Sequence, residues 1–167
     1  AASEFLGALR ALGEAGAPAL IQIVRDDALS GRRVRAPALQ MLCVAKPRPK
    51  NLVTVVLACL EDTELDLREQ AASDLRILGA EAKQATPILA RLVKDPNTEK
   101  PETYLQALRL LGEASTLAQL WKDPALSGRR VRTAVLRELC QVQPRPKDLI
   151  ATLLEAGARV RLAATLP

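Results

Sequence analysis

The chain has no histidine and only three aromatic residues, Phe5, Tyr104 and Trp121, among its 167. Histidine is the commonest general base and a common metal ligand, so its absence removes the usual starting point for an enzyme or a zinc site. A large single core would normally contain more aromatic side chains. The apolar residues are almost all Ala, Leu and Val, which suits closely packed small helices.

Cysteine and long apolar runs are scarce as well. Cys43, Cys59 and Cys140 are odd in number and lack CxxC spacing, which favours small apolar packing positions over disulfides or a metal site. The longest apolar run, Leu52 to Leu60, is interrupted only by Thr54 and falls far short of the roughly 20 residues that cross a bilayer. With 24 Lys and Arg against 19 Asp and Glu, the formal charge is +5, which permits an acidic partner without requiring one.

Repetition is what the sequence does contain. The stretch ALSGRRVR occurs unchanged at Ala28 to Arg35 and at Ala125 to Arg132, 97 residues apart. In this register 17 of 33 positions match, and PRPK at Pro47 to Lys50 returns at Pro144 to Lys147. A self-similarity this strong predicts a chain built from one small repeated unit.

Apolar residues recur at helical spacing on both sides of each Gly or Pro stop, which predicts an all-α chain without strands. Pro37 predicts a kink inside its helix. Thr63, with Asp66 three residues on, is predicted to cap the N-terminus of the first helix in the next pair, and Gly79 is predicted to end that helix. The predicted helices are Phe5–Ala15, Ala17–Asp26, Arg32–Lys46, Asn51–Leu60, Thr63–Leu78, Lys83–Asp95, Glu102–Ala114, Thr116–Lys122, Arg129–Gln143 and Asp148–Gly157, with another starting at Ala158.

Consecutive helices pair into units of about 30 to 36 residues, within the range of helical solenoids. The units cover about 1–27, 28–62, 63–96, 97–124 and 125–157, with a partial unit at 158–167. LGEA at Leu12 to Ala15 returns at Leu111 to Ala114, 99 residues on, so a three-unit block looks duplicated. Both ends fall inside a first helix, and a finished solenoid needs polar capping repeats, so we expect a fragment of a longer array.

At LREQAASDLRILG and RRVRTAVLREL the sequence resembles the short bacterial HEAT-like repeats of the PBS-lyase type. A hydrophobic-Arg pair opens the first helix of four units, at Val34-Arg35, Leu67-Arg68, Val131-Arg132 and Val160-Arg161, while the fourth unit departs with Leu105-Gln106. The resemblance implies a single domain that is a right-handed α-solenoid of about five antiparallel helix pairs. Some HEAT-like proteins are similar to bilin lyases or DNA alkylation-repair glycosylases, but no constellation here supports either activity.

The carboxylates Glu14, Asp74 and Glu113 fall where a solvent-facing helical stripe would place them, with no catalytic partner at a suitable spacing. We therefore expect no enzymatic activity, no metal and no cofactor. The expected function is a scaffold that binds a partner protein or peptide on a concave surface lined by the second helices. The polar positions expected on that surface are Gln22, Arg25, Thr54, Arg91, Lys94, Gln119, Lys122 and Thr152.

Two basic clusters raise the alternative of binding a nucleic-acid phosphate backbone. The missing aromatic platform and the nearby acids Asp26, Asp27, Glu61 and Asp62 favour a protein or peptide partner over nucleic acid. The net positive charge permits that partner to be acidic. The residues expected to contact the partner are Arg32, Arg33, Arg48, Lys50, Arg129, Arg130, Arg145 and Lys147.

A second set of arginines is expected to be structural. The paired arginines Arg32-Arg33 and Arg129-Arg130 are predicted in first helical turns, where the macrodipole disfavours positive charge by roughly 0.3–1 kcal/mol each. We expect these pairs to remain available to an acidic partner, while other arginines bind turn carboxylates of a neighbouring unit, such as Asp26, Asp62, Asp95 or Asp123. This structural ladder consists of Arg35, Arg68, Arg132 and Arg161.

The location is unknown from the sequence, and the cytoplasm is favoured because no segment predicts a membrane span or secretion signal. A signal could be missing if the chain begins inside a larger protein. The identity of the partner and the oligomeric state do not follow from the sequence.

Overall fold

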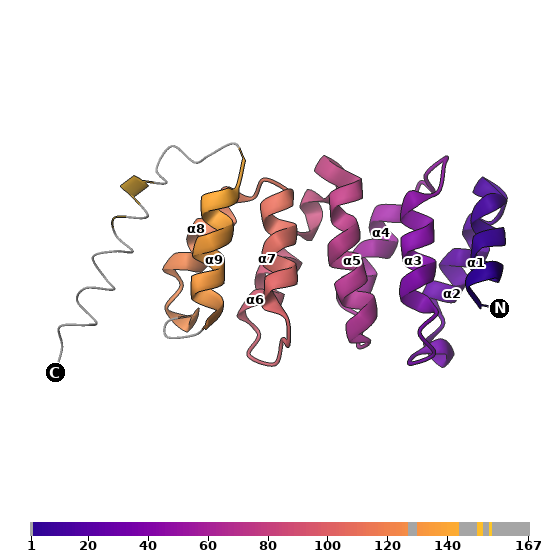
Figure 1. Cartoon of the computed structure of the whole chain (residues 1–167), viewed down its shortest axis with the longest axis horizontal. Helices are drawn as coiled ribbons and strands as arrows, with labels where there is room; N and C mark the ends of the chain where they lie inside the picture. The colour runs from indigo at the N-terminus through magenta and orange to yellow at the C-terminus, as the bar shows by residue number, and fades with distance from the viewer. Residues whose placement is uncertain (1, 127–129, 144–149, 152–153, 155–167) are drawn as a thin grey trace.

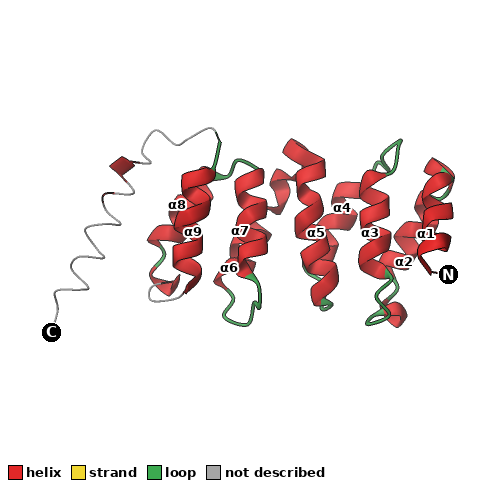
Figure 2. Ribbon diagram, viewed as in Figure 1, coloured by secondary structure: helices red, strands yellow, loops and turns green. Residues whose placement is uncertain are grey.

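The computed structural model describes residues 2–126, 130–143, 150, 151 and 154. The described residues form nine α-helices and four short 3-10 helices, and none of them lies in a strand (Figure 2). The α-helices are α1 Ala2–Ala11, α2 Ala17–Arg25, α3 Arg35–Val44, α4 Leu52–Leu60, α5 Leu65–Leu78, α6 Thr86–Lys94, α7 Pro101–Leu110, α8 Ala114–Lys122 and α9 Arg130–Gln141. The 3-10 helices are η1 Gly13–Ala15, η2 Asp27–Leu29, η3 Gly79–Ala85 and η4 Pro124–Leu126.

The α-helices form two layers. Figure 1 shows α1, α3, α5, α7 and α9 side by side in the front layer, with α2, α4, α6 and α8 behind them. Each odd-numbered helix packs against the next odd-numbered helix, and each even-numbered helix packs against the odd-numbered helix that follows it. The contacts between helices therefore join mostly elements that are close in the sequence, and the all-α prediction is confirmed for the described part of the chain.

Leucines at helical spacing form the core between the layers, as the apolar periodicity predicted. Leu39 and Leu42 of α3, Leu67 and Leu75 of α5, and Leu105 of α7 are each at most 1% exposed. Burial of such side chains is the main favourable term in folding, about 1.5–3 kcal/mol for each leucine. Every described helix is too short or too polar to span a membrane.

The cysteines confirm the packing prediction in two cases of three. Burial raises the pKa of Cys43 and raises that of Cys59 to about 12, so both thiols stay protonated near neutral pH. Cys140, which occupies the same repeat position as Cys43, is exposed, so the prediction is wrong there. Helix α3 is packed between α1 and α5, whereas α9 makes its contacts with α7 and α8.

One difference from the predicted boundaries is the start of α3, at Arg35 instead of Arg32. Arg32 and Arg33 lie in the preceding turn, where Arg33 has a left-handed φ of 54°. Pro37 is the third residue of α3, a position at which the missing N–H costs no helical hydrogen bond. The predicted kink is therefore wrong, and Pro37 instead limits how early the helix can begin.

Helix α9, which includes part of the second copy of ALSGRRVR, has no proline near its start and begins earlier in the repeat. It begins at Arg130, which corresponds to Arg33 in the 97-residue register, two residues earlier than α3 does. At the position of Pro37, α9 has Ala134, which can donate its N–H within the helix. The first-turn prediction is thus wrong for the Arg32-Arg33 pair, right for Arg130, and outside the described residues for Arg129.

The start of α5 also differs from the sequence prediction. The N-cap position is occupied by Glu64, whose side chain makes no capping hydrogen bond, so Thr63 lies one residue too early to cap the helix. Asp62 instead accepts the backbone N–H of Glu64 at 2.9 Å. Gly79 ends the helix as predicted. The predicted helix at 148–157 and the start at 158 lie outside the described residues except for 150, 151 and 154.

Candidate binding surface and the Arg35 cluster

Arg35, the first residue of α3, is a buried cation whose guanidinium is 2% exposed. Its Nε donates to the carbonyl of Val24 at 2.8 Å, which ties it to the end of α2. Its two Nη atoms lie 3.2 and 2.6 Å from the Asp62 carboxylate, and Nη1 also lies 3.2 Å from Glu64. Asp27, which is almost fully exposed, accepts from Nη2 at 3.3 Å. Arg35 therefore joins the end of α2 to the turn between α4 and α5.

The charges in this cluster stabilise one another. Burial alone would lower the pKa of Arg35, but the hydrogen bonds and charges of Asp62 and Glu64 outweigh it and raise the pKa. Burial would likewise raise the pKa of Asp62, but hydrogen bonds from Arg35 and from the Glu64 N–H hold it below its ordinary value. Both groups stay ionised near neutral pH, so the cluster is a fixed ionic link between the end of α2 and the turn before α5.

The other arginines expected in a ladder have different surroundings. Arg68 and Asp95 line one small pocket, yet no ion pair joins them, and the buried Nε of Arg68 has no hydrogen-bond partner. Arg132 lies over the ring of Trp121, 4.5 Å from its centroid. Trp121 occupies the position that Val24 has in the first copy. Arg161 is outside the described residues, so the ladder as a whole stays a prediction.

Further ion pairs connect residues about one predicted unit length apart, and the sequence analysis did not predict them. In the pairs that are also hydrogen-bonded, the two partners are 29 to 31 residues apart in the sequence. The unit length itself is the signal that could have found them. The pairs are Arg91 with Glu61, Lys94 with Asp123 at 2.7 Å, Lys100 with Glu69 at 2.9 Å, Arg109 with Glu138 at 2.8 Å and Lys83 with Glu113 at 3.8 Å.

The candidate partner-binding residues of the first copy do not form one patch. Arg32 and Arg33 are exposed before the start of α3, whereas Arg48 and Lys50 are exposed after its end. A helix of this length separates the two groups by about 15 Å. The Arg48 guanidinium donates to the carbonyl of Ile77 at 2.8 Å. In the second copy, Arg130 is exposed at the start of α9, while Arg129, Arg145 and Lys147 are outside the described residues.

The layer of even-numbered helices carries a uniform set of polar residues. No Asp or Glu occurs within α2, α4, α6 or α8. Thr152 lies outside the described residues, but the other expected surface positions are all exposed: Gln22, Arg25, Thr54, Arg91, Lys94, Gln119 and Lys122.

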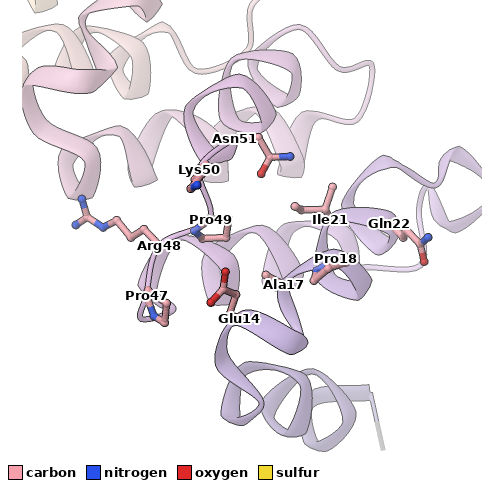
Figure 3. A pocket seen from close by; sticks show the side chains of 10 residues that line it. All are labelled: Glu14, Ala17, Pro18, Ile21, Gln22, Pro47, Arg48, Pro49, Lys50 and Asn51. Carbon is pink, nitrogen blue, oxygen red and sulfur yellow. The ribbon is translucent and has the colours of Figure 1, made fainter.

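A pocket of about 570 Å³ opens between α2 and the PRPK loop of Pro47 to Lys50, which precedes α4 (Figure 3). The close-up shows Pro49 facing Pro18 and Ile21 across the pocket, with the Glu14 carboxylate directed toward the space between them. The sequence pattern assigned Glu14 only to a solvent-facing stripe. The pocket depends on two distant turns meeting, which no local pattern predicts. Its lining consists of Glu14, Ala17, Pro18, Ile21, Gln22, Pro47, Arg48, Pro49, Lys50 and Asn51.

The odd-numbered layer also has hollows, but their linings are more polar. One of about 450 Å³ lies between α3 and α5 and includes Arg33, Gln40 and Glu69. Another, of about 370 Å³, lies between α5 and α7 and includes Arg76 and Gln106. Neither has the continuous apolar wall of the pocket beside α2.

Asp74 was expected to face solvent, and this prediction is wrong, because the residue is 3% exposed and lies on the buried side of α5. It accepts a hydrogen bond from Gln70 at 3.0 Å on one oxygen, while the other oxygen is buried without a partner. Burial raises its pKa, against the opposing effects of the hydrogen bond from Gln70 and the charge of Arg76. Its spacing from Leu67 and Leu78 is that of the buried face, a signal that could have placed it correctly.

Within the described part of the chain, no group of His, Cys, Asp and Glu side chains could hold a metal ion. None of the known family models, curated proteins and solved structures compared with the chain matches it.

Proposed function

We propose that the chain is part of a right-handed, HEAT-like α-solenoid and acts as a non-enzymatic scaffold that binds a partner protein or peptide. The repeated ALSGRRVR, LGEA and PRPK segments support this architecture, as do the two helical layers and the ion pairs spaced by 29 to 31 residues. The proposed binding surface is the layer formed by α2, α4, α6 and α8.

The observation that carries the proposal is the composition of this layer. Its helices contain no acid, and each of them exposes polar side chains toward solvent. Gln22, Thr54 and Gln119 can each donate and accept hydrogen bonds, which suits the N–H and C=O groups of a polypeptide. Repeat proteins commonly use such an extended face for binding.

Binding to a phosphate backbone is the second candidate, favoured by the exposed Arg32 and Arg33, neither of which has an ion pair with another described residue. Two observations count against it. Arg91 and Lys94 on the even-numbered layer pair with Glu61 and Asp123, which reduces the positive field there. The remaining cations also lack the aromatic platforms on which bases stack.

A photo-crosslinking experiment tests the proposed surface. A photoreactive amino acid at Thr54 or Gln119 marks the even-numbered layer, and the same residue at Gln40 or Gln106 marks the odd-numbered layer as a matched control. We expect one discrete protein to be crosslinked from the even-numbered positions and not from the odd-numbered ones. Crosslinks from the odd-numbered positions alone would contradict the proposal.

The second candidate is tested by measuring affinity for duplex and single-stranded nucleic acid at two salt concentrations. Contacts with phosphates release counterions, so real backbone binding weakens steeply as salt rises. Tight binding with a steep salt slope, lost when Arg32 and Arg33 are both replaced by Gln, would favour phosphate binding over the scaffold.

A further inference from the structure

We infer that the pocket between α2 and the PRPK loop binds an acidic peptide segment in which an apolar side chain lies next to Asp or Glu. The inference rests on the proposed scaffold function and adds to it the place and the chemistry of one contact. It depends on how the pocket is built, on its apolar walls and on the charges around its rim.

The pocket forms where two repeated segments meet. Gly13 of the first LGEA turn lies so close to the chain before PRPK that an added Cβ would be 3.4 Å from the Lys46 carbonyl oxygen. In the second copy, a Cβ on Gly112 would be 3.7 Å from the carbonyl oxygen of Gln143, the residue equivalent to Lys46. Both glycines have a left-handed φ, 57° and 74°, which glycine adopts without strain. The approach of the LGEA turn to the residue that precedes PRPK in the sequence thus occurs in both copies.

The walls of the pocket suit one apolar side chain. Ala17 and Pro18 begin α2, Ile21 follows one turn later on the same face, and Pro47 and Pro49 come from the loop. Proline rings are rigid and present only carbon atoms at their surface, so they hold their shape without an occupant. A volume of about 570 Å³ falls within the ordinary range for ligand pockets, roughly 300–1,000 Å³.

The rim of the pocket has more positive than negative charge. Lys46, Arg48 and Lys50 are exposed along the loop, and Glu14 is the only acid that lines the pocket. The Arg48 side chain leads away from the pocket in Figure 3, toward the Ile77 carbonyl that it donates to, so it adds charge without direct contact. Lys50 is the cation best placed to pair with a carboxylate of the bound segment.

Two further groups favour a carboxylate beside Lys50. Asn51 lines the pocket at the N-cap of α4, and its side chain caps no backbone N–H, so its amide can donate to a ligand. The first turn of α4 follows directly, and the N-terminal end of a helix stabilises negative charge. Glu14, on the opposite side, can accept a backbone N–H of an extended peptide.

The test uses an array of short labelled peptides, each with one apolar residue flanked by Asp or Glu, and a matched array with Lys at the flanking positions. Affinity of the whole chain is measured by fluorescence anisotropy. Lys50→Gln removes the carboxylate partner and Ile21→Ala reduces the apolar wall, while Arg32→Gln removes the same charge at the opposite end of α3 as the control. Circular dichroism verifies that each variant keeps its helices.

We expect the acidic array to contain binders that the basic array lacks, and Lys50→Gln to weaken them about tenfold, the equivalent of about 1.4 kcal/mol. Ile21→Ala should weaken them also, and Arg32→Gln should not. Three results would overturn the inference. The basic array could bind as well as the acidic one, the acidic array could contain no binder, or its binders could be unaffected by Lys50→Gln and Ile21→Ala. None of these outcomes decides the scaffold function, because the crosslinking positions Thr54 and Gln119 lie outside this pocket.

Discussion

Replacing Arg35 by Ala is the sharpest test of what holds neighbouring helices together, because this side chain links the end of α2 to the turn between α4 and α5. At Arg35 the substitution removes four partners at once, the Val24 carbonyl and three carboxylates. Two of those carboxylates, Asp62 and Glu64, are only 17% and 10% exposed. They would be left close together without the cation that neutralises them.

Breaking a buried ion pair by removing one partner costs about 3–5 kcal/mol, mostly because a buried charge loses its compensation. We therefore expect Arg35→Ala to lower the free energy of unfolding by about 3–5 kcal/mol. In thermal unfolding the loss at Arg35 corresponds to a fall in Tm on the order of 10 °C.

Urea and thermal unfolding, followed by far-ultraviolet circular dichroism, provide the measurement. A double-mutant cycle with Asp62→Ala should give a coupling energy of about 1–3 kcal/mol. Because the folded pKa of Asp62 lies below its ordinary value of 3.8, the pair stabilises the protein above that pH. Its contribution is lost as the pH falls through the folded pKa. A loss below about 1 kcal/mol for Arg35→Ala, or a coupling below about 0.5 kcal/mol, would refute the reasoning.

Three further substitutions test local features of the fold. Asp74→Asn should raise the free energy of unfolding near neutral pH by about 1 kcal/mol, since burial disfavours the charged form. Urea unfolding should show this gain shrinking as the pH is lowered toward 3.8, the ordinary pKa of the carboxyl. Over that range the native carboxyl, whose pKa is raised, already binds its proton. Gly13→Ala should lower the same free energy by about 1–2 kcal/mol, whereas Gly7→Ala, in a helix with open space around it, should not lower it. Pro37→Ala should let α3 begin at Arg33, which backbone chemical shifts would report; unchanged non-helical shifts at Arg33 would contradict the role given to this proline.

The sequence predicts helix existence well here because each helix has an apolar face with a strong 3.6-residue period. It predicts boundaries less well where one residue decides them, as Pro37 does for α3. Asp74 was open to correct prediction, since its spacing from Leu67 placed it on the buried face. The candidate pocket could not be predicted in this way, because it requires the turn at Glu14 to meet a loop more than thirty residues away. Only tertiary packing brings the two segments together.

The two copies of ALSGRRVR show why a repeated motif does not by itself assign a role to its residues. Arg35 is surrounded by carboxylates, whereas its equivalent Arg132 lies over the ring of Trp121, the residue that corresponds to Val24. The surroundings, and not the octapeptide, therefore decide whether an arginine is structural. The same reasoning directs the search for binding residues toward exposed side chains beside a formed pocket. Lys50 meets that condition, while Arg35 is already committed to the fold.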